Sequence, residues 1–183
     1  MERTFLAVPV PPRVRATYTR SLEARSGNGW RWVPPQNLHV TLRFLGAAEP
    51  ARLDALRLAL ADALRTTARF TATLGGGGTF GSRRVPNVLW IGFDDGLEEL
   101  VDLLRAVSSA ADSVGFAPQK RAGKPHVTVG RNSKRQPLEA WPGGTQADPL
   151  GGESIPVEGV TLYSSRLSPA GAVYTEVWTV PLA

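Results

Sequence analysis

Apolar residues recur along this chain with two different periods, and the period changes from segment to segment. Alternation of apolar and polar residues, or a short continuous apolar run, is typical of a strand, whereas apolar residues three or four apart are typical of a helix. The first pattern predicts strands at residues 4–10, 38–45, 70–74, 88–93, 126–131, 157–167 and 172–182. The last two segments are expected to form a closing hairpin.

Three segments have helical spacing instead. Their apolar positions are Val14, Tyr18 and Leu22 in the first, Leu53, Leu56, Leu60 and Leu64 in the second, and Leu97, Leu100, Val101, Leu104, Val107, Ala111 and Val114 in the third. We expect the first helix to end near Gly27 and the second to carry Pro50 in its first turn. The third is expected to start at Asp94 or Asp95 and to stop at Gly115.

Two segments are expected to be irregular. The glycine run at 75–78 is not followed by Gly-Lys-Ser/Thr, so it is predicted to be a flexible turn rather than a phosphate loop. Residues 132–154 are polar and rich in Gly and Pro, which predicts a loop. Because strands and helices are mixed without strict alternation, the fold class is expected to be α+β with antiparallel sheets.

One short segment occurs twice. Residues 37–42 read Asn-Leu-His-Val-Thr-Leu, and residues 124–129 read Lys-Pro-His-Val-Thr-Val, with the two histidines 87 positions apart. A single bilobal domain over residues 1–183 explains the repeat. We expect two pseudo-symmetric lobes of antiparallel sheet with outer helices around a central cleft, and His39 and His126 on facing strands.

The composition narrows the class of protein. The 183 residues are 42% hydrophobic and 20% charged, as in ordinary soluble globular proteins. The chain has no cysteine, which excludes disulfide scaffolds, cysteine-ligated metal sites and thiol nucleophiles. No apolar run reaches the length of a membrane span or of a signal-peptide core. We therefore expect a cytoplasmic protein without a membrane partner. We also expect a monomer.

The net charge of +5 is unevenly distributed. Residues 117–138 contain no acidic residue and six basic ones, Lys120, Arg121, Lys124, Arg131, Lys134 and Arg135. Residues 26–48 contain Arg31 and Arg43 and again no acid. Both histidines of the chain fall in these two stretches. A basic stretch is either a solvated surface loop or a site for an anion, and the charge alone leaves both open.

Strand periodicity places the histidine and the threonine of each repeated segment on one face of the strand. Residues i and i+2 of a strand point the same way, so His39 pairs with Thr41, and His126 with Thr128. The residues expected to point the other way, into a core, are Val40, Leu42, Phe44, Val127 and Val129. Each strand thus offers one imidazole and one hydroxyl, unless both histidines are merely polar residues on a solvated sheet face.

Phosphodiester chemistry fits two imidazoles and two hydroxyls in a basic region. One histidine takes a proton from the nucleophile while the other gives one to the leaving oxygen, and both tasks suit a pKa near 6.5. Hydroxyls and a guanidinium stabilise the charge that develops on phosphate oxygens. A metal site fits poorly because neither histidine has a carboxylate nearby in sequence. A Ser-His-Asp triad would need a carboxylate from a distant segment.

The paired His-Val-Thr segments, with the flanks at 32–46, 88–92 and 162–165, resemble the two-histidine (2H) phosphoesterases. Within them the chain is most similar to the bacterial and archaeal RNA 2′,3′-cyclic phosphodiesterases, also known as 2′-5′ RNA ligases. The resemblance covers nearly the whole chain. It implies metal-independent hydrolysis of RNA or oligonucleotide 2′,3′-cyclic phosphate ends to 2′-phosphomonoesters, no cofactor, and weak 2′-5′ RNA ligation by reversal of similar chemistry.

The resemblance also implies roles for individual residues. His39 would protonate the leaving 3′ oxygen and His126 would activate water, with Thr41 and Thr128 binding the phosphate. The basic residues around His126 disfavour its imidazolium form, which agrees with this order, whereas His39 would stay protonated more easily.

Arg131 is implied as a further phosphate contact, although strict alternation puts it on the face opposite His126. A bulge at Gly130, or reach around the strand end, would bring it back; a plain surface position is the alternative. Arg43 shares the face of His39 by alternation and is a second candidate. Trp32 and Phe80 could stack a base or simply line the core or cleft.

Two other functions stay open at this point. The same motif pair would serve a 2H enzyme that acts on another cyclic or 2′-5′ phosphodiester. A basic module that binds RNA ends without catalysis would show the same charge pattern.

Overall fold

The computed structural model describes residues 2–23, 30–82, 84–119, 123–132, 150–169 and 171–183. Within them lie three α-helices, α1 (Pro12–Glu23), α2 (Pro50–Leu64) and α3 (Leu97–Ser113), and one short 3-10 turn, η1 (Pro35–Asn37). The nine strands are β1 (Arg3–Pro9), β2 (Arg31–Trp32), β3 (His39–Ala47), β4 (Phe70–Gly81), β5 (Pro86–Asp95), β6 (Val127–Arg131), β7 (Ser154–Val157), β8 (Gly159–Ser168) and β9 (Gly171–Pro181).

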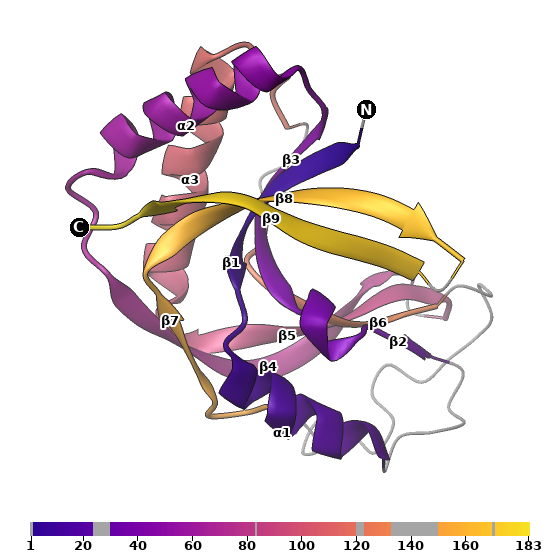
Figure 1. Cartoon of the computed structure of the whole chain (residues 1–183). Helices are drawn as coiled ribbons and strands as arrows, with labels where there is room; N and C mark the ends of the chain where they lie inside the picture. The colour runs from indigo at the N-terminus through magenta and orange to yellow at the C-terminus, as the bar shows by residue number, and fades with distance from the viewer. Residues whose placement is uncertain (1, 24–29, 83, 120–122, 133–149, 170) are drawn as a thin grey trace.

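All nine strands belong to one antiparallel sheet that curls into a half-barrel (Figure 1). The order is β7-β4-β5-β6-β3-β1-β8-β9, and β2 pairs with β6. The sheet has two halves, which meet where β3 pairs with β6 at Val40 and Val127. Helices α2 and α3 pack side by side, and α1 lies apart from them next to η1 (Figure 1). The α+β class with outer helices is therefore confirmed.

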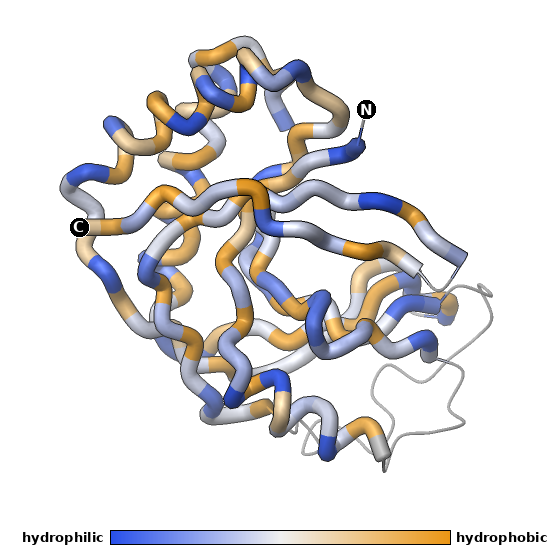
Figure 2. The backbone as a smooth tube through the Cα atoms, viewed as in Figure 1, coloured by the Kyte–Doolittle hydropathy of each residue, from blue (hydrophilic) through white to orange (hydrophobic). Residues whose placement is uncertain are grey.

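One continuous apolar core joins the helices to the sheet. Both α2 and α3 mix hydrophobic with hydrophilic positions (Figure 2), and the hydrophobic ones recur three or four residues apart. Leu56, Leu60 and Leu64 of α2 are fully buried, and each buried leucine contributes about 1.5–3 kcal/mol. Helix α3 adds Leu100, Leu103, Leu104 and Val107. These leucine positions are the ones whose spacing predicts the helices.

The two faces of β1 belong to different clusters. Leu6 and Val8 lie in the main core. The alternating residues Phe5 and Ala7 form a second, smaller cluster with Tyr163, against which Tyr174 packs. Because side chains of a strand alternate between faces, this second cluster lies on the face of the sheet opposite the main core.

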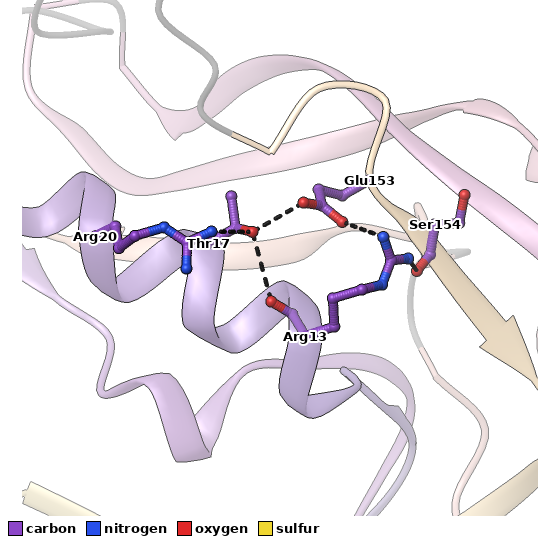
Figure 3. A network of polar contacts seen from close by, with 5 residues as sticks. All are labelled: Arg13, Thr17, Arg20, Glu153 and Ser154. Atoms are coloured by element: carbon purple, nitrogen blue, oxygen red, sulfur yellow. Dashed lines mark hydrogen bonds and ion pairs between the residues drawn. The ribbon is translucent and has the colours of Figure 1, made fainter.

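Polar side chains join helix α1 to the chain at the start of β7 (Figure 3). Glu153 accepts a hydrogen bond from the Thr17 hydroxyl at 2.8 Å and lies 3.0 Å from an Arg13 nitrogen. Arg13 also donates to the Ser154 carbonyl at 3.3 Å, and Arg20 donates to Thr17 at 3.1 Å. These contacts join segments about 140 residues apart in sequence.

Most predicted strands are confirmed within two residues at each end, including the closing hairpin of β8 and β9. Helix α2 begins at Pro50 as expected. Helix α3 begins later than predicted, at Leu97, because Asp94 and Asp95 still belong to β5 and Gly96 caps the helix. The predicted end of the first helix near Gly27 lies outside the described residues.

The prediction of a flexible turn at Gly75–Gly78 is wrong, since β4 runs through it and pairs with β5. A Cβ on Gly78 would lie 2.5 Å from the ring of Trp90 on the neighbouring strand. Gly78 therefore leaves space for a large side chain from the neighbouring strand, a requirement that the local sequence does not show.

The prediction of a loop at 132–154 extends one residue too far. Its last residue, Ser154, starts the strand β7, which pairs with β4. Residues 133–149 of that loop lie outside the described part of the chain. In the described residues, no helix is both long and apolar enough to cross a membrane.

Arg43 was expected on the face of His39 and lies on the other one. Arg43 pairs with Leu6 and Thr41 pairs with Ala7, so Leu42 is an extra residue, a bulge that reverses the alternation. Arg43 is 1% exposed and donates to the Asp112 carboxylate of α3 at 2.6 Å and to the Ala117 carbonyl at 2.7 Å. It anchors α3 to the sheet.

We predict that Asp112→Asn lowers the free energy of unfolding by about 1–3 kcal/mol, because it weakens a charge-assisted bond to a buried guanidinium. The carboxylate is half-exposed, which keeps the loss below that of a fully buried pair. Asp102→Asn is the matched control, because it removes an exposed ion pair with Arg105 on the same helix and should change stability by only about 0–1 kcal/mol. Urea denaturation measures both, and equal losses would contradict the anchoring role.

Candidate active site

The two His-Val-Thr segments lie on adjacent strands at the junction of the two halves. Val40 of β3 is paired with Val127 of β6. Counting outward from this antiparallel pair puts His39 across from Thr128 and Thr41 across from His126. Residues diagonal to each other in such a ladder lie about 7–8 Å apart, so both imidazoles are within reach of one small group.

Both histidine rings are held in the same way. Nδ1 of His39 lies 2.7 Å from the Asn37 carbonyl oxygen, and Nδ1 of His126 lies 2.7 Å from that of Lys124. A carbonyl only accepts, so each Nδ1 donates its hydrogen. In the neutral ring, Nε2 is then the nitrogen with the free lone pair. Each motif thus presents Nε2 for proton transfer.

Each histidine also packs against aromatic rings. The ring of His39 lies 4.9 Å from Phe5 and 5.4 Å from Tyr174. The ring of His126 lies 4.9 Å from Phe80 and 6.2 Å from Trp90. Of the two aromatics proposed from the sequence, Phe80 therefore lies against His126.

Burial is the main influence on the acidity of both histidines. It lowers the pKa of His39 from 6.5 to about 4, outweighing the hydrogen bond to Asn37, and the positive Arg131 adds to the lowering. Burial also lowers the pKa of His126, with smaller contributions from Arg131 and Lys124. Both rings are neutral near pH 7 without substrate. The expectation that His39 stays protonated more easily is wrong, because burial outweighs the neighbouring charges counted from the sequence.

A bulge brings Arg131 to the site. Leu89 pairs with Gly130 and Trp90 pairs with Thr128, so Val129 is the extra residue in β6. The bulge lies at Val129 rather than at Gly130, the position suggested by the sequence. It restores Arg131 to the face of His126. In agreement with this position, the positive charge of Arg131 lowers the pKa of both histidines.

The bulge is fixed by hydrogen bonds to the carbonyl of its extra residue. The Tyr18 hydroxyl of α1 donates to the Val129 carbonyl at 2.8 Å, and the Val33 amide donates to the same oxygen at 2.9 Å. Tyr18 is 2% exposed. A buried residue of a helix distant in sequence thus helps to hold the bulge that turns Arg131 to this face.

The two motifs carry bulges at equivalent positions. Leu42 and Val129 are each the third residue after a histidine, and both are buried. The fifth residue after each histidine, Phe44 or Arg131, therefore returns to the site's face. The expectation that Phe44 points into the core is wrong, because its side chain is 65% exposed.

A cavity of about 620 Å³ opens at this face. His39, Thr128 and Arg131 contribute to its wall, whereas Thr41 and His126 are placed at the site by the strand register. Its other lining residues include Arg3, Arg31, Trp32 and Tyr174. Arg31 stands out in the sequence as part of an acid-free stretch. Arg3 gave no such signal, since only the pairing of β1 with β3 and β8 brings it here.

Comparison with known proteins reveals relatives over nearly the whole chain. A family described as LigT-like phosphoesterase matches residues 7–90. The RNA 2′,3′-cyclic phosphodiesterase of Methanothermobacter thermautotrophicus is 33% identical over 180 residues, which is 96% of each chain. A Thermus thermophilus protein of the same name is 35% identical over 94% of this chain and 86% of its own.

Solved structures agree with this similarity. A structure from Thermus thermophilus has a TM-score of 0.80 at 29% identity and covers 98% of this chain and 97% of that one. Escherichia coli LigT in its apo form has a TM-score of 0.78 at 29% identity, covering 100% of this chain and 98% of its own. The E. coli protein is also known in complexes with phosphate, 3′-AMP, ATP and NADP+.

We predict that the two imidazoles titrate below their usual range in the free protein. Since the chain has only two histidines, ¹⁵N NMR shows two sets of ring signals, and the set that is lost in His39→Gln belongs to His39. At pH 7 both should be neutral with the hydrogen on Nδ1, and His39 should titrate near pH 4. A ring of His39 that is protonated at pH 7 without ligand would contradict the burial argument.

The lowered pKa of His39 also makes the stability of the fold depend on pH. The unfolded chain takes up a proton on His39 near pH 6.5, but the folded chain does so only near pH 4. The free energy of unfolding should therefore fall as the pH is lowered through this window. His39→Gln should remove this part of the pH dependence.

Proposed function

Since the chain belongs to the LigT-like phosphoesterase family, we propose that it hydrolyses the 2′,3′-cyclic phosphate at the end of an RNA or oligonucleotide strand. The observation that carries the proposal is the pair of His-Val-Thr segments on adjacent strands, each with Nδ1 bound to a backbone carbonyl. The names of the relatives, RNA 2′,3′-cyclic phosphodiesterases, supply the substrate class.

In the proposed reaction, His126 is the base and His39 is the acid. Nε2 of His126 takes a proton from water, whose oxygen attacks phosphorus. The bond from phosphorus to the 3′ oxygen breaks, and Nε2 of His39 gives its proton to that oxygen. The product is a 2′-phosphomonoester. The same chemistry, with a 5′ hydroxyl in place of water as the nucleophile and the same 3′ oxygen leaving, gives weak 2′-5′ ligation.

Because the pKa of His39 is low in the free protein, His39 can act as the acid only if bound substrate raises that pKa and the ring takes up a proton. A neutral imidazole has no proton to give on Nε2, since its one hydrogen is on Nδ1. The negative charge of a bound phosphate favours imidazolium and raises the pKa of both histidines. The acid form is then populated in the complex with substrate and not in the free protein.

The developing charge on the phosphate is met by Arg131, Thr41 and Thr128. The guanidinium supplies charge-assisted hydrogen bonds, and the hydroxyls donate to the non-bridging oxygens. The two imidazoles supply both acid and base, so the proposed mechanism uses no metal ion and no cofactor.

Two alternatives differ from this proposal in their substrate or in catalysis. A 2H phosphodiesterase for another cyclic or 2′-5′ bond would use the same residues. An RNA-end-binding module would use the same arginine-lined cavity without turnover.

We expect the protein to convert a dinucleotide with a 2′,3′-cyclic phosphate end to the 2′-phosphate in the presence of excess chelator. Proton-coupled ³¹P NMR distinguishes the 2′ from the 3′ product. Turnover that stops with chelator would contradict the metal-independent mechanism, and tight binding without turnover would favour the binding module. If the protein cleaved a 2′-5′ dinucleotide but not the cyclic phosphate, the result would favour a 2H phosphodiesterase for 2′-5′ bonds.

We predict that His39→Ala and His126→Ala each slow hydrolysis by about 10²–10⁴-fold, the usual contribution of a general acid or base. A substrate with sulfur in place of the 3′ oxygen needs little help from an acid, because a thiolate is a good leaving group. On this substrate His39→Ala should recover much of its rate and His126→Ala should not. Rescue of His126→Ala would reverse the roles, and rescue of neither would contradict a separate acid and base.

A further inference from the structure

Phe44 is a large apolar residue at an unusual place, since it is 65% exposed on the strand that carries His39. The bulge at Leu42 turns it to the same face as His39, opposite Phe5 of β1. It contributes little to the core, so its exposure needs another explanation.

Phe44 lines a hollow of about 390 Å³ beside the candidate active site. Arg3, Ser165 and Tyr174 line both this hollow and the larger cavity that contains His39. The two spaces are therefore parts of one groove. No acidic side chain is found among the described residues that line either part.

Aromatic rings lead from His39 to Phe44 without interruption. The ring of Tyr174 lies 5.4 Å from His39, and that of Phe5 lies 4.9 Å from both His39 and Tyr174. The ring of Phe44 lies 6.0 Å from Phe5. An aromatic floor under a basic groove is the usual arrangement for binding single-stranded nucleic acid.

Phe44 is also the counterpart of Arg131, five residues after the other histidine and beyond an equivalent bulge. One half of the sheet thus presents a guanidinium to the site, and the other half presents an aromatic ring. A guanidinium suits a phosphate, whereas an exposed ring suits a base.

We propose that the hollow beside Phe44 is a subsite for the second nucleoside of the RNA strand, the one that precedes the cyclic-phosphate end. Its base stacks on Phe44, and Arg3 contacts the phosphate that links the two nucleosides. This inference rests on the proposed function, with the terminal nucleotide in the larger cavity. The positive charge and the missing acids favour a polyanionic strand over an apolar peptide as the occupant.

The test compares a nucleoside 2′,3′-cyclic phosphate with a dinucleotide that has the same terminal nucleoside. In the wild type, kcat/KM should be higher for the dinucleotide. In Phe44→Ala the ratio of the two kcat/KM values should fall about tenfold, the size expected for one base–aromatic stack. Phe44→Trp should retain the ratio. Leu58→Ala is the control, because Leu58 is 69% exposed on α2 and should leave the ratio unchanged.

A ratio that Phe44→Ala leaves unchanged would overturn the subsite, whatever the absolute rates. If the wild type cleaves neither compound, the proposed function fails separately. Calorimetric binding of the two 2′-phosphate products then decides the subsite: weaker binding of the dinucleotide alone in Phe44→Ala supports it, and equal binding overturns it.

Discussion

The pairing of β3 with β6 at Val40 and Val127 is the contact on which the site depends. The antiparallel register there sets each histidine across from the threonine of the other motif. Two segments 87 residues apart thereby become one constellation of two imidazoles and two hydroxyls. The buried valines on the opposite face hold the strands to the core, so the geometry is supported by packing rather than by the polar groups themselves.

The site also depends on two departures from regular alternation. Without the bulge at Val129, Arg131 would point to the face opposite the histidines, and without that at Leu42 Phe44 would do so. Hydrogen bonds from Tyr18 and Val33 hold the bulge at Val129. The equivalent bulge on β3 turns Arg43 toward α3, where it anchors the helix to the sheet. One irregularity thus serves both stability and the site.

The sequence alone predicted what depends on local periodicity. His39 and Thr41 lie where strand alternation expects them, and the leucines of α2 lie where helical spacing expects them. The sequence predicted the wrong face for Arg43 and Phe44 and left that of Arg131 open. Each of these residues follows a bulge, and the bulged Leu42 and Val129 are ordinary apolar residues that carry no local signal. Gly78 was misread because its reason, the ring of Trp90, lies on another strand. Arg3 reaches the cavity only through strand pairing.

In the proposed complex a single phosphate lies between the two anchored imidazoles, with Arg131 brought to it by the bulge. The most direct test is a crystal structure of the protein with a nucleoside and orthovanadate, which imitates the five-coordinate phosphorus of the transition state. We expect Nε2 of both His39 and His126 within about 3 Å of vanadate oxygens, and the Arg131 guanidinium bound to the same group. A vanadate held by only one histidine, or an Arg131 that points to the opposite face, would contradict this placement of the phosphate.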